Sequence, residues 1–245
     1  MTIERLVAPA KLTLSLRIVG IRDDGYHLID AEMVTLDLAD VLDLEPTVDR
    51  DGALEVVDGA TGRVEAIPTG SDNLVAKALR LCGRTADVRL TKHIPPGAGL
   101  GGGSADAAAV LRWAGFTDLV AAARIGADVP FCLVGGRAAV GGIGEEVTPL
   151  PYVEQTVTLL TPPFGCSTPA VYAAWDRLGG PVADGPNDLE AAALLVEPRL
   201  AEHRDRLGDA TGQTPVLAGS GSTWFVPGAH PGEGRIVART TPAPA

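Results

Sequence analysis

The sequence predicts an α+β fold with two lobes. Strand-like and helix-like patterns are mixed along its 245 residues, which is typical of that class. A glycine-rich segment, residues 94–104, lies between a predicted strand and a predicted helix. A second glycine-rich turn, residues 219–221, joins two further predicted strands near the C-terminal end. A strand–loop–helix unit and a later strand–turn–strand unit are therefore expected in one chain.

The composition indicates a globular protein and excludes some classes of partner. Hydrophobic residues make up 46% of the chain and charged residues 21%, which argues against disorder. The net charge of −11 argues against binding to nucleic acid or to an anionic membrane surface. Cys82, Cys132 and Cys166 are odd in number and far apart, so neither a disulfide framework nor a zinc site is expected. Reduced thiols, no signal peptide and no membrane-crossing run together predict a cytoplasmic protein.

The first predicted strand covers residues 5–19. From Lys11 onward apolar and polar residues alternate, which predicts that Leu12, Leu14, Leu16 and Ile18 face the core. On this pattern alone, Lys11 is typical of a solvent-exposed strand charge.

A turn at residues 20–27 and a second long strand at residues 28–44 follow. Tyr26 and His27 stand where the turn meets this strand. They are open to two interpretations: ordinary hairpin packing, or stacking on and hydrogen bonding to a flat ring.

The remaining elements are predicted from periodicity, N-cap residues and helix breakers. Residues 45–70 predict a short hairpin. Helices are predicted at residues 74–82, 104–113, 118–125, 170–178, from 187 onward, and at 198–207. Strands are predicted at residues 87–92, 137–140, 146–149, 155–161, within 216–226, and at 235–240.

The segment 94–104 favours a phosphate-binding site. Its glycines let the backbone approach a ligand closely, and the helix after it exposes free N–H groups at the positive end of its dipole. No Lys-Ser or Lys-Thr closes the segment, so it is not a Walker A motif. The alternative is a flexible connector or a tight turn.

Asp128 stands between Ala and Val in a turn before Pro130. Either it caps a helix, or it is a buried carboxylate held in position for chemistry.

Three segments together resemble the motifs of the GHMP kinases, the small-molecule kinases of galactose, homoserine, mevalonate and relatives. They are Pro9-Ala-Lys-Leu, Pro95-Pro-Gly-Ala-Gly-Leu-Gly-Gly-Gly-Ser and Leu217-Ala-Gly-Ser-Gly-Ser. Asp24-Gly-Tyr-His and Gly126-Ala-Asp-Val-Pro-Phe are similar to the branch that acts on a CDP-linked sugar alcohol. The resemblance implies a two-lobed fold with lobes at residues 1–148 and 149–245. It also implies ATP-dependent phosphorylation of that alcohol's 2-hydroxyl in non-mevalonate isoprenoid synthesis.

The resemblance also implies roles for individual residues. Asp128 is the expected catalytic carboxylate and Lys11 its catalytic partner, while Tyr26, His27 and Tyr172 are expected to contact the cytosine. Mg²⁺ is the expected metal, with the hydroxyl of Ser104 as its ligand. A small-molecule substrate and a monomer or homodimer are expected. The implied nucleotide-binding residues are Asn73, Pro95, Pro96, Gly97, Ala98, Gly99, Leu100, Gly101, Gly102, Gly103, Ser104 and Ala105.

The chain departs from the family pattern at several places. Thr13 replaces an Asn, Met33 replaces an aromatic residue, and a loop at residues 227–234 stands where the family has a helix. Two alternatives therefore stay open: another GHMP kinase, acting on homoserine or a sugar, and a nucleotide-binding relative that has lost catalysis. The three predicted base contacts argue against the first alternative, and the presence of both Lys11 and Asp128 argues against the second.

Overall fold

The computed structural model describes residues 2–48, 52–63 and 70–244. Within these ranges, helices and strands are mixed, which confirms the α+β class. The strands are β1 (Glu4–Ile21), β2 (His27–Pro46), β3 (Leu54–Asp58), β4 (Ala86–Lys92), β5 (Arg137–Gly141), β6 (Glu146–Leu150), β7 (Thr156–Leu160), β8 (Val216–Leu217), β9 (Trp224–Pro227) and β10 (Arg235–Thr241). The helices are α1 (Leu74–Leu81), α2 (Gly102–Trp113), α3 (Leu119–Ala123), α4 (Val129–Val134), α5 (Thr168–Arg177), α6 (Glu190–Val196) and α7 (Leu200–Thr211).

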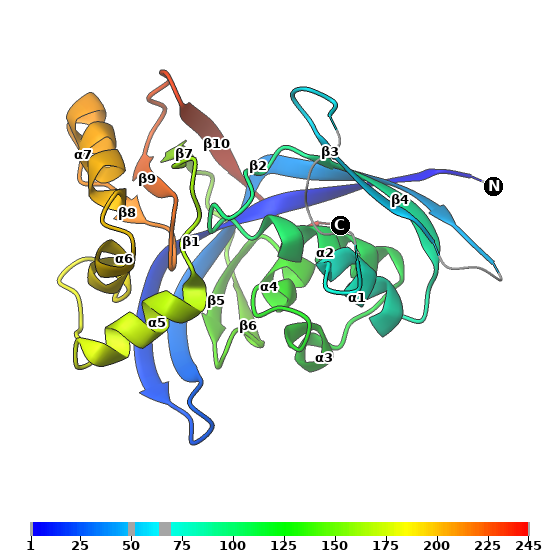
Figure 1. Cartoon of the computed structure of the whole chain (residues 1–245), viewed down its shortest axis with the longest axis horizontal. Coiled ribbons are helices and arrows are strands. Elements are labelled where there is room, and N and C mark those ends of the chain that lie inside the picture. Colours follow the sequence, from blue (N-terminus) through cyan, green and yellow to red (C-terminus); the bar gives the residue numbers. More distant parts are fainter. Residues whose placement is uncertain (1, 49–51, 64–69, 245) are drawn as a thin grey trace.

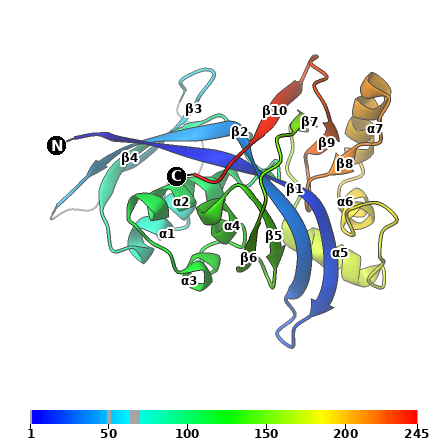
Figure 2. The same ribbon diagram turned by 180° about the vertical axis from the view of Figure 1, so that it is seen from behind.

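The long antiparallel pair β1–β2 is the frame of the molecule. The pair runs from Glu4 opposite Leu44 to Ile21 opposite His27. β2 also pairs with β4, β5 and β10, so most of the sheet is built on it. Helices α1–α4 gather on one side of these strands, whereas α5–α7 lie at the other end of the molecule beside β7–β9 (Figures 1 and 2).

β10 joins the two ends of the sheet. Its residues 235–239 pair with β7, and Thr240 and Thr241 pair with β2. The predicted lobe boundary at residues 148 and 149 falls within β6. The division into lobes stays a prediction, because one sheet continues from one end to the other.

The apolar residues of β1 pack against the core as predicted, but they do so in two separate hydrophobic clusters. The register shifts between Pro9 and Lys11, and again between Thr13 and Ser15. Leu12 therefore packs in one hydrophobic cluster and Leu16 in the other. A bulge inserts an extra residue and re-aims the side chains that follow it, which simple alternation does not anticipate.

Two helices differ from the prediction, and the hairpin expected over residues 45–70 lies partly outside the described ranges. Residues 49–51 and 64–69 are not described, and β3 pairs in parallel with β4. Helix α4 was not predicted, because it is short and follows a turn. Helix α6 begins at Glu190 instead of Asn187, because the Asn187 side chain is buried and donates to the carbonyls of Leu217 and Gly219.

Among the described residues, the helices are too short or too polar to span a lipid bilayer.

Candidate active site

The glycine-rich segment forms a loop that opens α2. Gly97, Gly99 and Gly101 have φ of 70°, 76° and 67°, a left-handed conformation that favours glycine. The first helical hydrogen bond of α2 runs from the Ala105 N–H to the Gly101 carbonyl, 2.8 Å away. The preceding N–H groups of the helix thus have no helical acceptor, and they stand at the positive end of its dipole. This is the arrangement that binds a phosphate.

The loop lines a cavity of about 620 Å³. Asn73 lines the same cavity while its side chain caps α1 by accepting from the Val75 N–H, 2.9 Å away. The predicted nucleotide-binding residues from Pro95 to Ser104 line it as well. Ala105 instead packs in the hydrophobic core, with 1% of its surface exposed.

Lys11 is buried beside the loop, contrary to the pattern-based interpretation of an exposed charge. Only 5% of the residue is exposed, and its backbone N–H donates to the Leu100 carbonyl at 3.0 Å. Its Nζ lies 3.3 Å from Oδ2 of Asp128 and donates to Oγ1 of Thr13 at 3.1 Å. Thr13 therefore supplies a hydrogen bond to the lysine at the position where the family has Asn.

Asp128 occupies the N-cap position of α4, but its side chain makes no capping hydrogen bond. Its carboxylate is one third exposed and pairs with Lys11 instead. Of the two interpretations left open, helix capping and a positioned carboxylate, the contacts favour the second.

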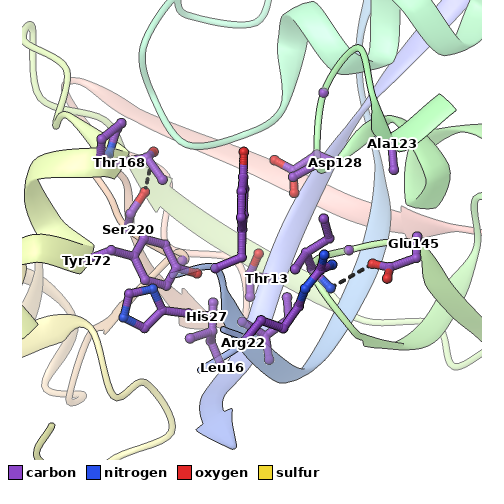
Figure 3. A pocket seen from close by; sticks show the side chains of 18 of the residues that line it. Thr13, Leu16, Arg22, His27, Ala123, Asp128, Glu145, Thr168, Tyr172 and Ser220 are labelled. Carbon is purple, nitrogen blue, oxygen red and sulfur yellow. Dashed lines mark hydrogen bonds between the residues drawn. The ribbon is translucent and has the colours of Figure 1, made fainter. Parts of the chain in front are cut away.

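Asp128 also lines a second cavity, of about 1160 Å³. Figure 3 shows His27 and Tyr172 across this cavity from Asp128. The rings of His27 and Tyr172 are 4.8 Å apart between centroids, and burial raises the pKa of the Tyr172 hydroxyl to about 12. Tyr26 also lines the cavity but is 59% exposed. Thus the structure brings together the residues predicted for catalysis and for base contact.

The two cavities share Asp128 and Gly99 as lining residues. A group bound on the glycine loop and a second molecule in the larger cavity would therefore meet at the Asp128 carboxylate and the Lys11 ammonium.

A buried cluster of charges beneath the loop was not predicted from the sequence. Nζ of Lys92 donates to a carboxylate oxygen of Asp40 and to Oδ2 of Asp106, the latter at 2.7 Å. The other oxygen of Asp40 accepts from the backbone N–H groups of His93 and Ile94, at 2.5 and 2.8 Å, where the chain enters the loop. Burial raises the pKa of Asp106 to about 7, against the opposing effect of the Lys92 ammonium. The cue in the sequence was a Lys two residues before the loop and an Asp in the first turns of its helix.

Comparison with known proteins agrees with this geometry. The model of the GHMP kinases N terminal domain matches residues 73–136. A 4-diphosphocytidyl-2-C-methyl-D-erythritol kinase of Paracoccus denitrificans is 40% identical, with 90% of this chain and 85% of the relative covered. One of Nitrobacter hamburgensis is 34% identical, with 95% and 89% covered. A crystal structure of 4-(cytidine 5'-diphospho)-2C-methyl-D-erythritol kinase, 30% identical, superposes with a TM-score of 0.75 over 97% of this chain and 99% of that one.

The fold, the matching family model and the relatives define a small-molecule kinase of the GHMP class. Within that class, the chain belongs to the family of 4-diphosphocytidyl-2-C-methyl-D-erythritol kinases.

We predict that Gly101→Ala lowers turnover by displacing Lys11. A Cβ at residue 101 would lie 2.7 Å from Cγ of Lys11, closer than atoms in contact allow. The matched control is Gly83→Ala, which has a similar φ of 64° but open space around the added Cβ. Both variants should lose about 1 kcal/mol of stability from backbone strain. Only Gly101→Ala should lose turnover, by about tenfold or more in an ADP-release assay. Equal turnover in both variants would contradict the role given to this close approach.

We predict that Asp106→Asn removes a pH dependence of stability. The pKa of Asp106 in the folded protein, about 7, lies above its ordinary value of 3.8. Between these values the folded chain holds a proton that the unfolded chain releases, so this group makes the free energy of unfolding fall as the pH rises. Relative to wild type, the variant should gain about 1 kcal/mol or more between pH 5 and pH 8 in chemical denaturation. Asp205→Asn, at an exposed position, is the control. A constant difference between Asp106→Asn and wild type at the two pH values would count against the assignment.

Proposed function

We propose that the protein transfers the γ-phosphoryl group of ATP to the 2-hydroxyl of 4-diphosphocytidyl-2-C-methyl-D-erythritol. The observation that carries the proposal is the meeting of the two cavities at Asp128. One cavity has the backbone amides that a triphosphate requires, and the other has aromatic walls for a base. The family to which the chain belongs supports the choice of substrate.

On the donor side, the loop amides and the start of α2 bind the phosphates. The residues present also fit Mg²⁺. Among the described residues, no cluster of three or more His, Cys, Asp or Glu could hold a metal ion. Mg²⁺ usually keeps water and phosphate oxygens as most of its ligands and takes few from the protein. The hydroxyl of Ser104, in the first turn of α2 and on the phosphate cavity, is the proposed protein ligand. When bound, the ion would neutralise charge on the β- and γ-phosphates.

At the junction, Asp128 accepts the proton of the attacking hydroxyl as the new P–O bond forms. The Lys11 ammonium, 3.3 Å from that carboxylate, stabilises negative charge on the transferring group. Thr13 fixes the Lys11 side chain through its hydroxyl. Phosphoryl transfer needs alignment and charge compensation more than covalent help, and this pair supplies both.

On the acceptor side, we assign the cytosine to the corner formed by Tyr26, His27 and Tyr172. The diphosphate then lies between this corner and Asp128, where a cation is required. Two cations on the cavity are already paired, Lys11 with Asp128 and Arg22 with Asp24. Among the described residues, no carboxylate pairs with Arg124, which also lines the cavity. Arg124 is therefore the proposed diphosphate contact.

The aromatic corner of Tyr26, His27 and Tyr172 also argues against the alternative functions. A kinase for homoserine or a simple sugar has no base to place there. A relative without catalysis has no need of a lysine and a carboxylate at 3.3 Å beside a phosphate cavity.

We predict that Asp128→Asn lowers kcat by about 10²- to 10⁴-fold while the KM values for ATP and the acceptor change only a few-fold. An amide preserves the size of the side chain and the N-cap preference but cannot take the proton. The measurement is ADP release with the CDP-linked methylerythritol, alongside a panel of other alcohols. The control is Asp118→Asn, because Asp118 caps α3 through its side chain and lies outside both cavities. Unchanged turnover in Asp128→Asn would contradict the role of Asp128 as proton acceptor. Faster turnover with another alcohol would contradict the proposed substrate.

We predict that Arg124→Ala raises the KM for the acceptor by about tenfold, because a charge-assisted contact with the diphosphate is lost. The kcat and the KM for ATP should stay within about twofold. Arg177→Ala, an exposed residue that lines neither cavity, is the matched control. An acceptor KM that is the same in both variants would remove Arg124 from the binding site.

A further inference from the structure

The position of the His27 ring is fixed by packing against α5. Its centroid lies 4.8 Å from that of Tyr172 in a tilted contact and 5.5 Å from that of Trp175 in an edge contact. Only 10% of the His27 side chain is exposed, although the residue follows an exposed turn. With the ring held in this way, recognition by His27 depends on which of its two nitrogens carries a proton.

Asp176 determines that choice. It stands one helical turn after Tyr172 on α5, and its Oδ1 lies 2.7 Å from Nε2 of His27 (Figure 3 shows the His27 and Tyr172 rings in the cavity). An ionised carboxylate can only accept a hydrogen bond, so Nε2 is the nitrogen that donates. Nδ1 has no hydrogen-bond partner among the described residues. A few buried polar atoms of the described residues lack a hydrogen-bond partner, and Nδ1 of His27 is not among them. Nδ1 is therefore accessible to solvent.

We propose that Asp176 is a positioning residue: in the neutral His27 ring it holds the proton on Nε2 and leaves Nδ1 as a hydrogen-bond acceptor, so that the site selects cytosine over uracil. The proposal rests on the function proposed above. Cytosine carries an amine, a donor, at the ring position where uracil carries a carbonyl oxygen. An unprotonated Nδ1 accepts a hydrogen bond from the amine. Opposite the uracil oxygen, two lone pairs would face each other and no hydrogen bond could form. A site built for one hydrogen bond discriminates strongly against a molecule that cannot complete it.

Without the carboxylate, nothing described in the structure holds the proton on Nε2. The neutral ring then exchanges between its two tautomers, and the form with a proton on Nδ1 can donate to the uracil oxygen. Loss of Asp176 should therefore weaken selection between bases and leave the reacting groups untouched, because Asp176 contacts neither Lys11 nor Asp128.

The first experiment compares kcat/KM for the CDP-linked and the UDP-linked methylerythritol. Wild type should favour the CDP-linked acceptor by on the order of 100-fold, and Asp176→Ala should reduce this ratio to below about tenfold. The loss should come from a higher KM for the CDP-linked acceptor, with kcat within about threefold. Asp205→Ala is the matched control, because Asp205 is also an exposed helical Asp and lies outside both cavities. A ratio unchanged in Asp176→Ala overturns the proposal.

The second experiment measures the tautomer directly and does not depend on catalysis. ¹⁵N NMR of the imidazole nitrogens resolves the four His of the chain, with His27→Gln assigning the resonance. Wild type should show a protonated Nε2 and a bare Nδ1, and Asp176→Ala should show a mixture of tautomers. A proton on Nδ1 in wild type overturns the proposal. If wild type releases no ADP with the CDP-linked acceptor, the proposed function fails, and the base selectivity inferred from it fails as well, whatever the tautomer.

Discussion

The close approach of the glycine loop to β1 is the constraint on which the rest of the site depends. The Leu100 carbonyl accepts from the Lys11 N–H, and the loop passes so near that a Cβ at Gly101 would meet the Lys11 side chain. On its other side the loop passes the second glycine-rich turn, where a Cβ at Gly99 would overlap the Gly221 carbonyl. Only glycines, which have no Cβ, fit between the Lys11 side chain and the Gly221 carbonyl. The same approach places the start of α2 next to the Lys11–Asp128 pair.

Two separate parts of the chain are thereby brought to one point. Lys11 comes from a strand whose bulges turn it toward the loop, and Asp128 comes from the first residue before a short helix. Neither side chain is held by its own element alone. Thr13 and Asp128 hold the lysine from two sides, and the burial of the lysine makes the arrangement rigid. A carboxylate and an ammonium preorganised in this way would require little rearrangement for the phosphoryl transfer proposed above.

The local chemistry of the sequence was enough to predict the fold class and the glycine loop, whereas the roles of Lys11, Asp128 and Tyr172 were expected only from the family resemblance. Glycines before a helix have a direct physical consequence, and so has an aromatic pair at a turn. The burial of Lys11 was not predictable from alternation, because it depends on bulges set by the pairing with β2. Asp176 could not be found either. Its contact with His27 joins residues 149 positions apart, and such a contact exists only once α5 has packed against the hairpin.

The charge cluster below the loop does not supply the attraction that the proposed binding of two anionic molecules requires. With a net charge of −11, the protein as a whole does not attract phosphates. Lys92 lies next to the loop, but two carboxylates surround its ammonium, so the cluster as a whole adds no positive charge. Attraction at the donor side must therefore come chiefly from the backbone amides, which act at short range, because the Lys11 ammonium is paired with Asp128. Such a site relies on the exact placement of a few dipoles and charges, which is why glycines that allow the backbone to come close matter more here than basic residues.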